Sequence, residues 1–537
     1  MRVVTVEQMK ALEAEGVQKG VSIEKMMLHA GFGIATAIME DFGGLDSRVA
    51  LGLVGPGNNG GDTLIALASL SKAGWKALAY ITKDRPADDP VLELVHKSDV
   101  EVAWRSEDRN LQKLSHWCKH AGLILDGILG TGVHLPLQKD LADLLGKIKS
   151  WRPPASVVAV DCPSGVDSGS GEAATETLPA RITYCLEAVK TGLLKLPAFQ
   201  YMGTIRDVPL NLPASLKTYG KIETFTASRN EIRSWMPERA ADAHKGSFGK
   251  LMIVAGSTNY TGAAYLAGRG AYRVGTGWVR MAVPTPLHRV LAGVMPEATW
   301  LLLPDELGAI SDEGVRLAQE NLAGMDALLL GPGLGQEETT FEFVRDLLTG
   351  KRGQNVGEMG FRAGGKNHTQ AGRLELPRMV IDADGLRLMA RIPGWAELLP
   401  TGSVLTPHPG EMAALTGLSV DEIQSDRLEI TRSFARQWKQ IVILKGALSV
   451  IANPQGQAYI NPFANSALAK AGTGDVLAGV VAGLIAQGMD PFRAAVAGCD
   501  IHARAAVLLA ESMGTEASVL AGEIADAIPL ALKDLVR

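Results

Sequence analysis

The spacing of apolar residues divides the first part of the chain into helices and a buried strand. Residues 5–42 repeat apolar side chains with the period of a helix, and the break at 20–22 predicts two helices. Ser22 stands where it can cap the second of them. The apolar run 48–54 is typical of a buried strand, and residues 63–68 predict a helix after a glycine-rich loop. A strand, loop and helix in this order can form a phosphate site.

Three predicted strands in this half end in polar residues. The loop 55–62 after the first strand holds two asparagines and an aspartate, and the runs 121–125 and 156–160 end in Asp126 and Asp161. The carboxyl ends of parallel strands meet at one edge of a sheet, where ligands bind. Any single aspartate here could be a turn or a cap, but together they predict a site.

The loop 55–62 departs from the common nucleotide-binding motifs. It is not Gly-x-Gly-x-x-Gly, and it lacks the Lys-Ser/Thr ending of a P-loop. Its side chains offer amide donors and oxygen acceptors, which suit a polar ligand and a hard cation. A purely structural turn is the alternative.

The order of strands and helices begins again in the second half. Residues 207–245 lack a long apolar period, and we place the boundary near 220, which gives domains 1–218 and 225–537. A helix rich in small residues is predicted at 261–272. Strands are predicted at 249–257, 277–283, 327–335, 378–385, 404–411 and 440–446, and the last four end in glycine or polar residues. The pattern indicates a second α/β domain.

One turn in this half combines glycines, an aspartate and an apolar helix. Residues 471–479 read Ala-Gly-Thr-Gly-Asp-Val-Leu-Ala-Gly. Gly472 and Gly474 let the backbone approach a ligand closely, and the free amides at the helix start favour an anion. Asp475 could then take a proton from an attacking hydroxyl. The turn predicts phosphoryl transfer, with an aspartate N-cap as the alternative.

Two other segments bear on this second site. His408 stands between two prolines at a predicted strand end, so it is held rigidly, and we interpret it as functional rather than structural. Residues 350–373 are rich in glycine and polar residues, which predicts a mobile surface insertion.

Composition excludes several classes of function. The 537 residues are too many for one core, and 46% hydrophobic with 21% charged residues are ordinary for a globular protein. The net charge of -5 argues against a nucleic-acid binder or a basic membrane-surface protein. The four cysteines show no paired spacing, and no run is long enough to span a membrane. We expect buried thiols in a cytoplasmic protein whose partners are small molecules.

The first half resembles the NAD(P)H-hydrate epimerases over about residues 1–215. The motifs that carry this resemblance are 57–62, Asp126 with 130–132, and Asp161 with 163–165. It implies a Rossmann-like three-layer α/β/α domain that binds a hydrated nicotinamide nucleotide. The implied substrate contacts are Asn58, Asn59, Gly60, Gly61, Asp62, Gly130, Thr131, Gly132, Val133, His134, Leu135, Pro136 and Asp161. The resemblance also implies a potassium ion held by Asn59, Asp126 and Ser164.

The proton-transfer residue of this domain stays open between Asp126 and Asp161. Lys190 matches a lysine of the family, with a solvated surface lysine as the alternative. The chain departs from the family at residues 28–29, where an acidic residue and an amide are usual, and at Thr63, where glycine is common.

The second half resembles the ADP- or ATP-dependent NAD(P)H-hydrate dehydratases of the ribokinase-like superfamily over about 225–535. The motifs are 406–411, 445–446 and 471–475. The resemblance implies substrate contacts from Ala263, Gly333, His408 and Asp475. It implies nucleotide contacts from Lys445, Gly446, Ala447, Leu448, Ser449 and Gly474, with Mg²⁺ bound to the nucleotide. Ser449, where threonine is frequent, and residues 465–467 depart from the pattern and bear on nucleotide affinity.

Together the resemblances imply a bifunctional repair enzyme for NADH and NADPH hydrates. The first domain would interconvert the R and S forms, and the second would dehydrate the S form with ADP, giving AMP and phosphate. Asp475 would remove the hydroxyl proton as the hydroxyl attacks the terminal phosphoryl group. The fused form resembles the bacterial type and favours ADP over ATP. We also expect a homo-oligomer.

Two other functions compete with repair. A small-molecule kinase of the same superfamily, for a vitamin precursor, would use the first half as a ligand-binding module. A non-catalytic scaffold would bind nucleotide without turnover. The epimerase signature on the same chain favours repair, and Asp475 argues against the scaffold.

Overall fold

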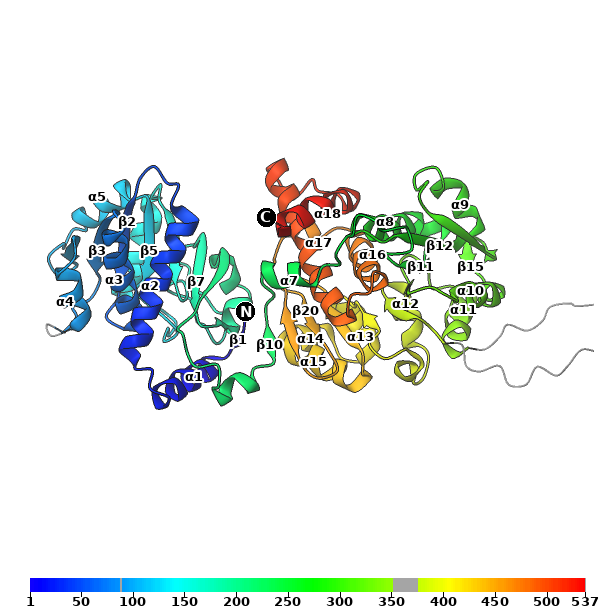
Figure 1. Ribbon diagram of the computed structural model, residues 1–537, viewed down its shortest axis with the longest axis horizontal. Helices are drawn as coiled ribbons and strands as arrows, with labels where there is room; N and C mark the ends of the chain where they lie inside the picture. The colour runs from blue at the N-terminus through cyan, green and yellow to red at the C-terminus, as the bar shows by residue number, and fades with distance from the viewer. Residues whose placement is uncertain (87–88, 351–374, 537) are drawn as a thin grey trace, which may run out of the picture. The chain divides into compact units, whose positions relative to one another are not determined.

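The computed structural model describes residues 1–86, 89–350 and 375–536. The chain divides into two compact units, Met1–Phe225 and Thr226–Arg537, coloured blue to green and green to red in Figure 1. The sequence pattern places this boundary near residue 220. The insertion predicted at 350–373 lies outside the described residues except for Gly350, the residue that follows α11 (Glu338–Thr349).

The first unit is built on a parallel sheet of seven strands. Their order is β4 (Val100–Trp104), β3 (Lys76–Ile81), β2 (Val49–Val54), β5 (Leu123–Gly127), β6 (Ser156–Val160), β7 (Ile182–Leu186) and β9 (Thr204–Val208). A small parallel pair joins β1 (Val3–Val4) to β8 (Val189–Lys190), and β10 (Thr224–Phe225) bridges back to Arg2. The three strands that end in polar loops, β2, β5 and β6, are neighbours, as the sequence predicts.

Helices cover both faces of this sheet. They are α1 (Val6–Gln18), α2 (Ile23–Phe42), α3 (Asn58–Lys72), α4 (Pro90–His96), α5 (Gln112–His120) and α6 (Lys139–Trp151). Side chains alternate along β2, so Ala50 and Val54 pack with α2 and α3, whereas Leu51 and Leu53 pack with α5 and α6. The predicted three-layer α/β/α architecture is confirmed. Ser22 caps α2, accepting from the Lys25 amide at 3.3 Å.

The second unit also has a largely parallel sheet. From one side its strands are β21 (Ala458–Ile460), β20 (Val450–Ala452), β19 (Ile441–Leu444), β18 (Val404–Leu405), β17 (Arg378–Ile381), β16 (Ala327–Leu330), β11 (Lys250–Val254), β12 (Trp278–Pro284) and β13 (Thr299–Leu303). Strands β19 to β13 run parallel, and β20 and β21 are antiparallel additions. A separate hairpin joins β14 (Asp305–Glu306) to β15 (Ala309–Ile310).

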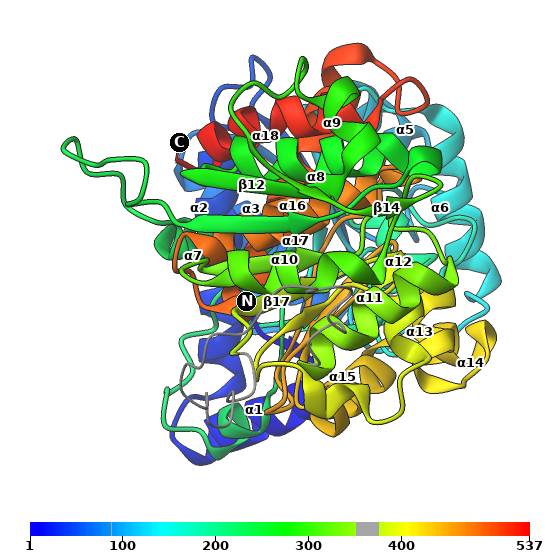
Figure 2. The same ribbon diagram turned by 90° about the vertical axis from the view of Figure 1, so that its right-hand side faces the viewer.

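Its helices again form two layers. They are α7 (Arg229–Trp235), α8 (Thr261–Arg273), α9 (Thr285–Leu291), α10 (Val315–Leu322), α11, α12 (Asp384–Ala390), α13 (Pro409–Thr416), α14 (Val420–Ser425), α15 (Arg427–Trp438), α16 (Thr473–Ala486), α17 (Pro491–Met513) and α18 (Ala521–Val536). Leu251 and Ile253 of β11 face the core with α8, α16 and α18, and Met252 and Val254 face the core with α10 to α12. Figure 2 shows α8 and α10 on opposite sides of the sheet.

Short 3₁₀ helices complete the structure at Thr191–Leu194, Ala198–Tyr201, Lys217–Lys221, Thr258–Tyr260, Asp312–Gly314, Trp395–Leu398 and Ser466–Leu468. All four cysteines are free and buried, as expected. In the described ranges, no helix has the length and apolar character needed to cross a membrane.

Candidate functional site

A cavity of about 680 Å³ opens at the carboxyl ends of β2, β5 and β6 in the first unit. Several predicted contacts line it, namely Asn58, Asn59, Asp62, Gly130, Thr131, Gly132 and Asp161. Gly60, Gly61 and residues 133–136 are not among the described residues of its lining. The two glycines have a packing role instead, because a Cβ at Gly60 would strike the Gly55 carbonyl and one at Gly61 would lie 2.6 Å from the Met27 sulfur.

A buried ion pair stands at one wall of this cavity. Asp161 follows β6 in the left-handed region, with φ of 62°, and its carboxylate accepts from the Leu186 amide at 3.0 Å and from the Lys190 ammonium. Lys190 is only 1% exposed and also donates to the Leu186 carbonyl at 3.1 Å. Burial lowers the pKa of Lys190, but the charge and hydrogen bond of Asp161, together with the nearby Cys185 and Cys162, outweigh burial and raise the pKa. The surface-lysine alternative is therefore wrong.

Two further carboxyl groups line the cavity near this pair. Burial raises the pKa of Asp62 well above its usual value, and the charges of Asp161 and Glu13 raise it further. Glu13 lies on the accessible rim, where partial removal from water raises its pKa. The sequence does not single out Glu13, because an acidic residue on an amphipathic helix is usually a solvated one. The wall therefore combines groups that can hold or release protons.

Asp126, the other candidate for proton transfer, faces a different environment. It is fully buried, and its two carboxylate oxygens accept from the Ser164 hydroxyl at 2.6 Å and the Ser164 amide at 2.8 Å. Ser164 Oγ in turn accepts from the Leu129 amide at 2.9 Å, and Asn59 Nδ2 donates to the Leu129 carbonyl at 2.8 Å. These contacts bring the three predicted potassium ligands into one network beneath the cavity.

His29 and Thr63, two of the residues that depart from the family pattern, each form a hydrogen bond within the first unit. His29 Nδ1 donates to the Leu210 carbonyl at 2.9 Å. Thr63 Oγ1 donates to the Asn59 carbonyl at 2.8 Å, and Gly127 leaves room for that hydroxyl, since a Cβ there would overlap it. The threonine therefore supports the loop that carries Asn59.

In the second unit, charged residues gather at the carboxyl ends of β17, β18 and β19. Lys445 Nζ lies 2.6 Å from Asp382 Oδ1 and 3.7 Å from Glu411 Oε2. Thr406 Oγ1 donates to the same Asp382 oxygen at 2.7 Å, while Asp382 Oδ2 is buried without a hydrogen-bond partner in the described part of the chain. Asp382 and Glu411 are not among the predicted contacts, although both lie in strand-end segments that the sequence marks as polar.

Asp475 stands beside this cluster at the start of α16. Gly472, with φ of 90°, is the N-cap residue, so Asp475 lies in the first helical turn and the N-cap alternative is wrong. Burial raises the pKa of Asp475 to about 7, Asp382 raises it as well, and Lys445 opposes them. An aspartate with this pKa is present in both protonation forms near neutral pH, which suits a general base.

His408 caps α13 through its side chain. Nδ1 accepts from the amides of Gly410 at 2.9 Å and Glu411 at 3.3 Å, which fixes the ring. Burial lowers the pKa of His408, and the charge of Glu411, whose Oε1 lies 3.3 Å from Nε2, opposes this shift. The predicted rigidity is present, and its physical cause is this cap.

The remaining predicted contacts lie in two groups. A Cβ on Gly333 would lie 2.7 Å from the Ala263 Cβ, so these two residues are neighbours. A Cβ on Gly474 would lie 3.4 Å from Lys445 Nζ, which brings the two predicted nucleotide loops together. Ser449 closes the 446–449 turn, because its hydroxyl donates to the Gly446 carbonyl at 2.9 Å. Arg427 donates to the carbonyls of Leu444 and Lys445 at 2.9 and 3.2 Å.

Sequence comparisons match both units to known families. Residues 23–192 match the model of the YjeF-related protein N-terminus, and residues 251–530 match the model of NAD(P)H-hydrate dehydratase. The bifunctional NAD(P)H-hydrate repair enzyme of Moorella thermoacetica is 33% identical over 522 residues, which are 95% of this chain and 92% of that protein. The enzyme of the same description from Escherichia coli is 31% identical over 498 residues, 92% of this chain and 87% of that one.

A solved structure overlaps the second unit. It is the ADP/ATP-dependent NAD(P)H-hydrate dehydratase from Bacillus subtilis co-crystallized with ATP/Mg²⁺, with 30% identity and a TM-score of 0.47 over 58% of this chain and 98% of that one.

Proposed function

The chain belongs to the family of bifunctional NAD(P)H-hydrate repair enzymes, and we propose how its residues divide the repair. The chain is both a lyase and an isomerase, with a Rossmann-like first unit and a ribokinase-like second unit. We assign epimerisation to the cavity at Asp161 and Lys190, and dehydration to the cluster around Asp475. The observation that carries the second assignment is a half-buried aspartate with a pKa of about 7 at a glycine-bounded helix start.

In the proposed dehydration, Asp475 takes the proton of the hydroxyl on C6 of the nicotinamide ring. The hydroxyl oxygen bonds to the terminal phosphorus of ADP, and the bond from that phosphorus to the bridging oxygen breaks, which releases AMP. The ring nitrogen then donates its electron pair, the C6–O bond breaks and phosphate leaves. Loss of a proton from C5 restores NADH or NADPH. Lys445 and the amides of the 472–474 turn stabilise negative charge on the transferred group.

The residues of this cluster fit a nucleotide that carries Mg²⁺. Asp382 presents a buried carboxylate oxygen without a partner among the described residues, and Glu411 lies near the same lysine. Carboxylate oxygens are the protein ligands that Mg²⁺ prefers. When bound, Mg²⁺ would neutralise charge on the phosphate oxygens. We propose ADP as the donor because the two-domain arrangement follows the bacterial repair enzymes.

In the proposed epimerisation, Asp161 exchanges a proton with the same C6 hydroxyl. Because C6 bears both this oxygen and the ring nitrogen, removal of the proton lets the C6–N bond open, with its electrons passing to nitrogen. Rotation of the free carbonyl and renewed attack by nitrogen on its other face, with return of the proton, invert C6. Lys190 places a positive charge beside Asp161, and Asp62 and Glu13 complete the polar wall.

The whole proposal is tested with hydrated NADH as a mixture of R and S forms. Return of the near-ultraviolet absorbance of NADH for the whole mixture, with release of inorganic phosphate, is expected with ADP and Mg²⁺. Recovery of the S fraction alone would contradict the assignment of the first unit. A stable phosphorylated product would instead indicate a small-molecule kinase.

Dehydration is expected to depend on pH through Asp475. The base must be ionised, and its pKa is raised to about 7. We therefore expect kcat/KM for the S hydrate to fall roughly tenfold per pH unit below that value and to level off above it. Initial rates with saturating nucleotide across the neutral range measure this profile. A rate that stays flat through neutral pH would contradict the role of Asp475 as base.

We propose that Asn59, Asp126 and Ser164 hold a potassium ion in the first unit. Asp126 is a fully buried carboxylate, and the charges and hydrogen bonds that shift its pKa include no cationic side chain of the described chain. Its oxygens, with those of Ser164 and Asn59, form a donor set that suits a hard cation. When bound, potassium would supply the missing positive charge.

Replacing potassium with a bulky organic cation is expected to slow epimerisation and leave dehydration of the S hydrate unchanged. Asp126→Asn is expected to lower potassium affinity, because it removes the charged oxygen ligand that a hard cation prefers. Thermal unfolding of the first unit as a function of potassium concentration gives a second readout. Equal epimerisation and equal unfolding temperatures with and without potassium would contradict this site.

A further inference from the structure

Arg85 contacts the glycine loop of the first unit from outside the cavity. Its Nη1 donates to the Gly55 carbonyl at 2.7 Å and to the Gly57 carbonyl at 3.1 Å. Gly57 immediately precedes Asn58, and Gly57, Asn58 and Asn59 all line the cavity. The Arg85 side chain is only 6% exposed, so its guanidinium is part of the folded interior.

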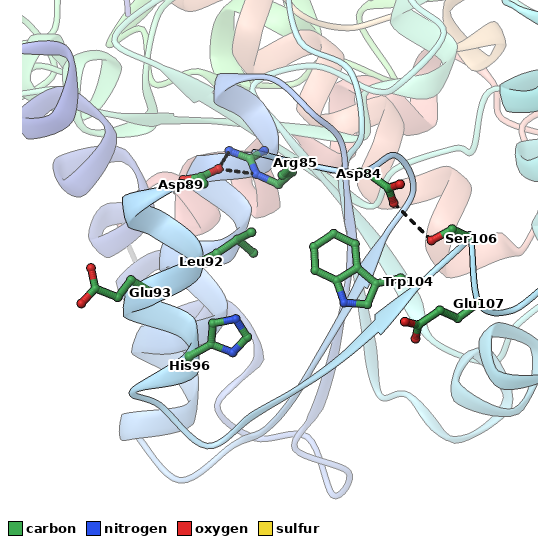
Figure 3. Close-up of a pocket in the computed structure, with 9 residues that line it drawn as sticks. All are labelled: Asp84, Arg85, Asp89, Leu92, Glu93, His96, Trp104, Ser106 and Glu107. Carbon is green, nitrogen blue, oxygen red and sulfur yellow. Dashed lines mark hydrogen bonds and ion pairs between the residues drawn. The ribbon is translucent and has the colours of Figure 1, made fainter. Parts of the chain in front are cut away.

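Asp89 holds Arg85 in this position. Its Oδ2 lies 2.7 Å from both Nε and Nη2 of Arg85. Its Oδ1 accepts from the Val91 amide at 2.9 Å, which makes Asp89 the N-cap of α4. Figure 3 shows the pair at the rim of a second cavity, of about 660 Å³, that shares no lining residue with the first. The carboxylate therefore connects the loop to α4.

The loop has few other means of holding its shape. Gly57 is the N-cap of α3 and contributes no side-chain cap. Glycine at positions 55 and 57 leaves the backbone free to adopt many conformations. Gly55 does donate to the Gly127 carbonyl, and the Gly57 carbonyl accepts from the Gly61 amide, both at 3.2 Å. Arg85 adds one side chain that bonds to the Gly55 and Gly57 carbonyls together. A buried, charge-assisted hydrogen bond is among the stronger contacts available for such a task.

We propose that Arg85, held by Asp89, is a positioning residue for epimerisation. By fixing the carbonyls of Gly55 and Gly57, it sets the direction of the amides and side chains that bind the hydrated nucleotide at 58–59. This inference rests on the epimerase function proposed for the first unit. It places Arg85 outside the chemistry itself, because the Asp161–Lys190 pair is on another wall.

The test uses the full chain with the R hydrate as sole substrate. A separate dehydratase that acts on the S hydrate and cannot epimerise is added in excess, so that epimerisation limits the rate. Arg85→Met is expected to raise KM for the R hydrate by about 10- to 100-fold, since a small displacement of binding groups has effects of this size. We expect kcat to change little and the pH profile to keep its shape, because a residue that only orients the binding groups affects binding of the ground state and the transition state alike. Asp89→Asn is expected to shift KM in the same direction by a smaller factor, and Arg85→Lys, which keeps a donor, should recover part of the loss.

Lys97→Met is the matched control, because Lys97 pairs with Glu93 at the end of the same helix, but its side chain is 70% exposed. It should behave as wild type. Dehydration of the S hydrate by each variant tests the integrity of the rest of the chain. Unchanged KM in Arg85→Met and Asp89→Asn would overturn the proposal, as would a fall in kcat with an altered pH profile. If Arg85→Met does not fold, Asp89→Asn and Arg85→Lys decide by the same criterion. No epimerisation by the wild-type chain would instead refute the function proposed for the first unit.

Discussion

Asp475→Asn is expected to lower kcat for dehydration of the S hydrate by about 10²- to 10⁴-fold, the usual contribution of one positioned general base. Asparagine keeps the size of the side chain but cannot accept the hydroxyl proton. KM for the hydrate and for ADP should change little, because Lys445, Gly474 and His408 remain in place. Initial rates of NADH formation from the pure S hydrate measure this loss.

The unfolding temperature of Asp475→Asn shows whether a loss of activity comes from the missing base or from a disturbed fold. The pKa of Asp475 in the folded protein, about 7, lies above its ordinary value of 3.8. A raised folded pKa contributes stability that is complete below the unfolded value and lost as pH rises through the folded value. Above about pH 7 the ionised carboxylate therefore opposes folding, and Asp475→Asn should unfold at the same or a higher temperature than wild type.

Two comparisons complete this experiment. Asp421→Asn removes an exposed aspartate from the first turn of α14 and should leave all rates unchanged. Epimerisation by Asp475→Asn should also be normal, because that reaction belongs to the other unit. Retention of most dehydration activity by Asp475→Asn would exclude Asp475 as the base.

The elements that the sequence predicts well are those determined by interactions between residues close together in the chain. The two helices within residues 5–42 are predicted by the helical spacing of their apolar residues, and the cap at Ser22 is predicted by its hydroxyl group. The neighbouring strands β2, β5 and β6 follow from apolar runs that end in polar loops. The turn before α16 is predicted because its glycines permit a tight backbone bend and because the first amides of a helix lack partners within the helix.

The contacts that the sequence leaves open join residues far apart in the chain. Lys190 is 29 positions from Asp161, and Lys445 is 63 positions from Asp382. No local pattern distinguishes such a lysine from a solvated one. Arg85 is a similar case, because its partners are carbonyl oxygens, which every residue carries.

The choice between Asp126 and Asp161 shows the same limit at shorter range. Both aspartates end apolar runs of similar length, so their spacing is uninformative. In the structure Asp126 is still within β5, and its carboxylate turns toward Ser164. Asp161 lies beyond β6 in a left-handed conformation and lines the cavity. Asp126 precedes the last residue of β5 and Asp161 follows the last residue of β6, and this difference of two positions decides which carboxylate lines the cavity.

Asp161→Asn is expected to reduce epimerisation of the R hydrate by about 10²- to 10⁴-fold while dehydration of the S hydrate continues. The asparagine oxygen can still accept from the Leu186 amide, so the shape of the wall is kept, but proton exchange with the substrate is lost. The measurement is NADH formation from pure R hydrate, with pure S hydrate as the internal control on the same chain. Full epimerisation by this variant would remove Asp161 from the mechanism.

The ion pair adds a second, independent signature. Breaking a buried pair by removing one partner typically costs about 3 to 5 kcal/mol, because the other charge remains buried. Asp161→Asn and Lys190→Met should therefore each lower the unfolding temperature of the first unit, whereas the double variant, which buries neither charge, should recover part of that stability. Epimerisation should stay lost in all three. If the double variant regained activity together with stability, the pair would be structural, and the proton-transfer group would have to be Asp62 or Glu13 on the same wall.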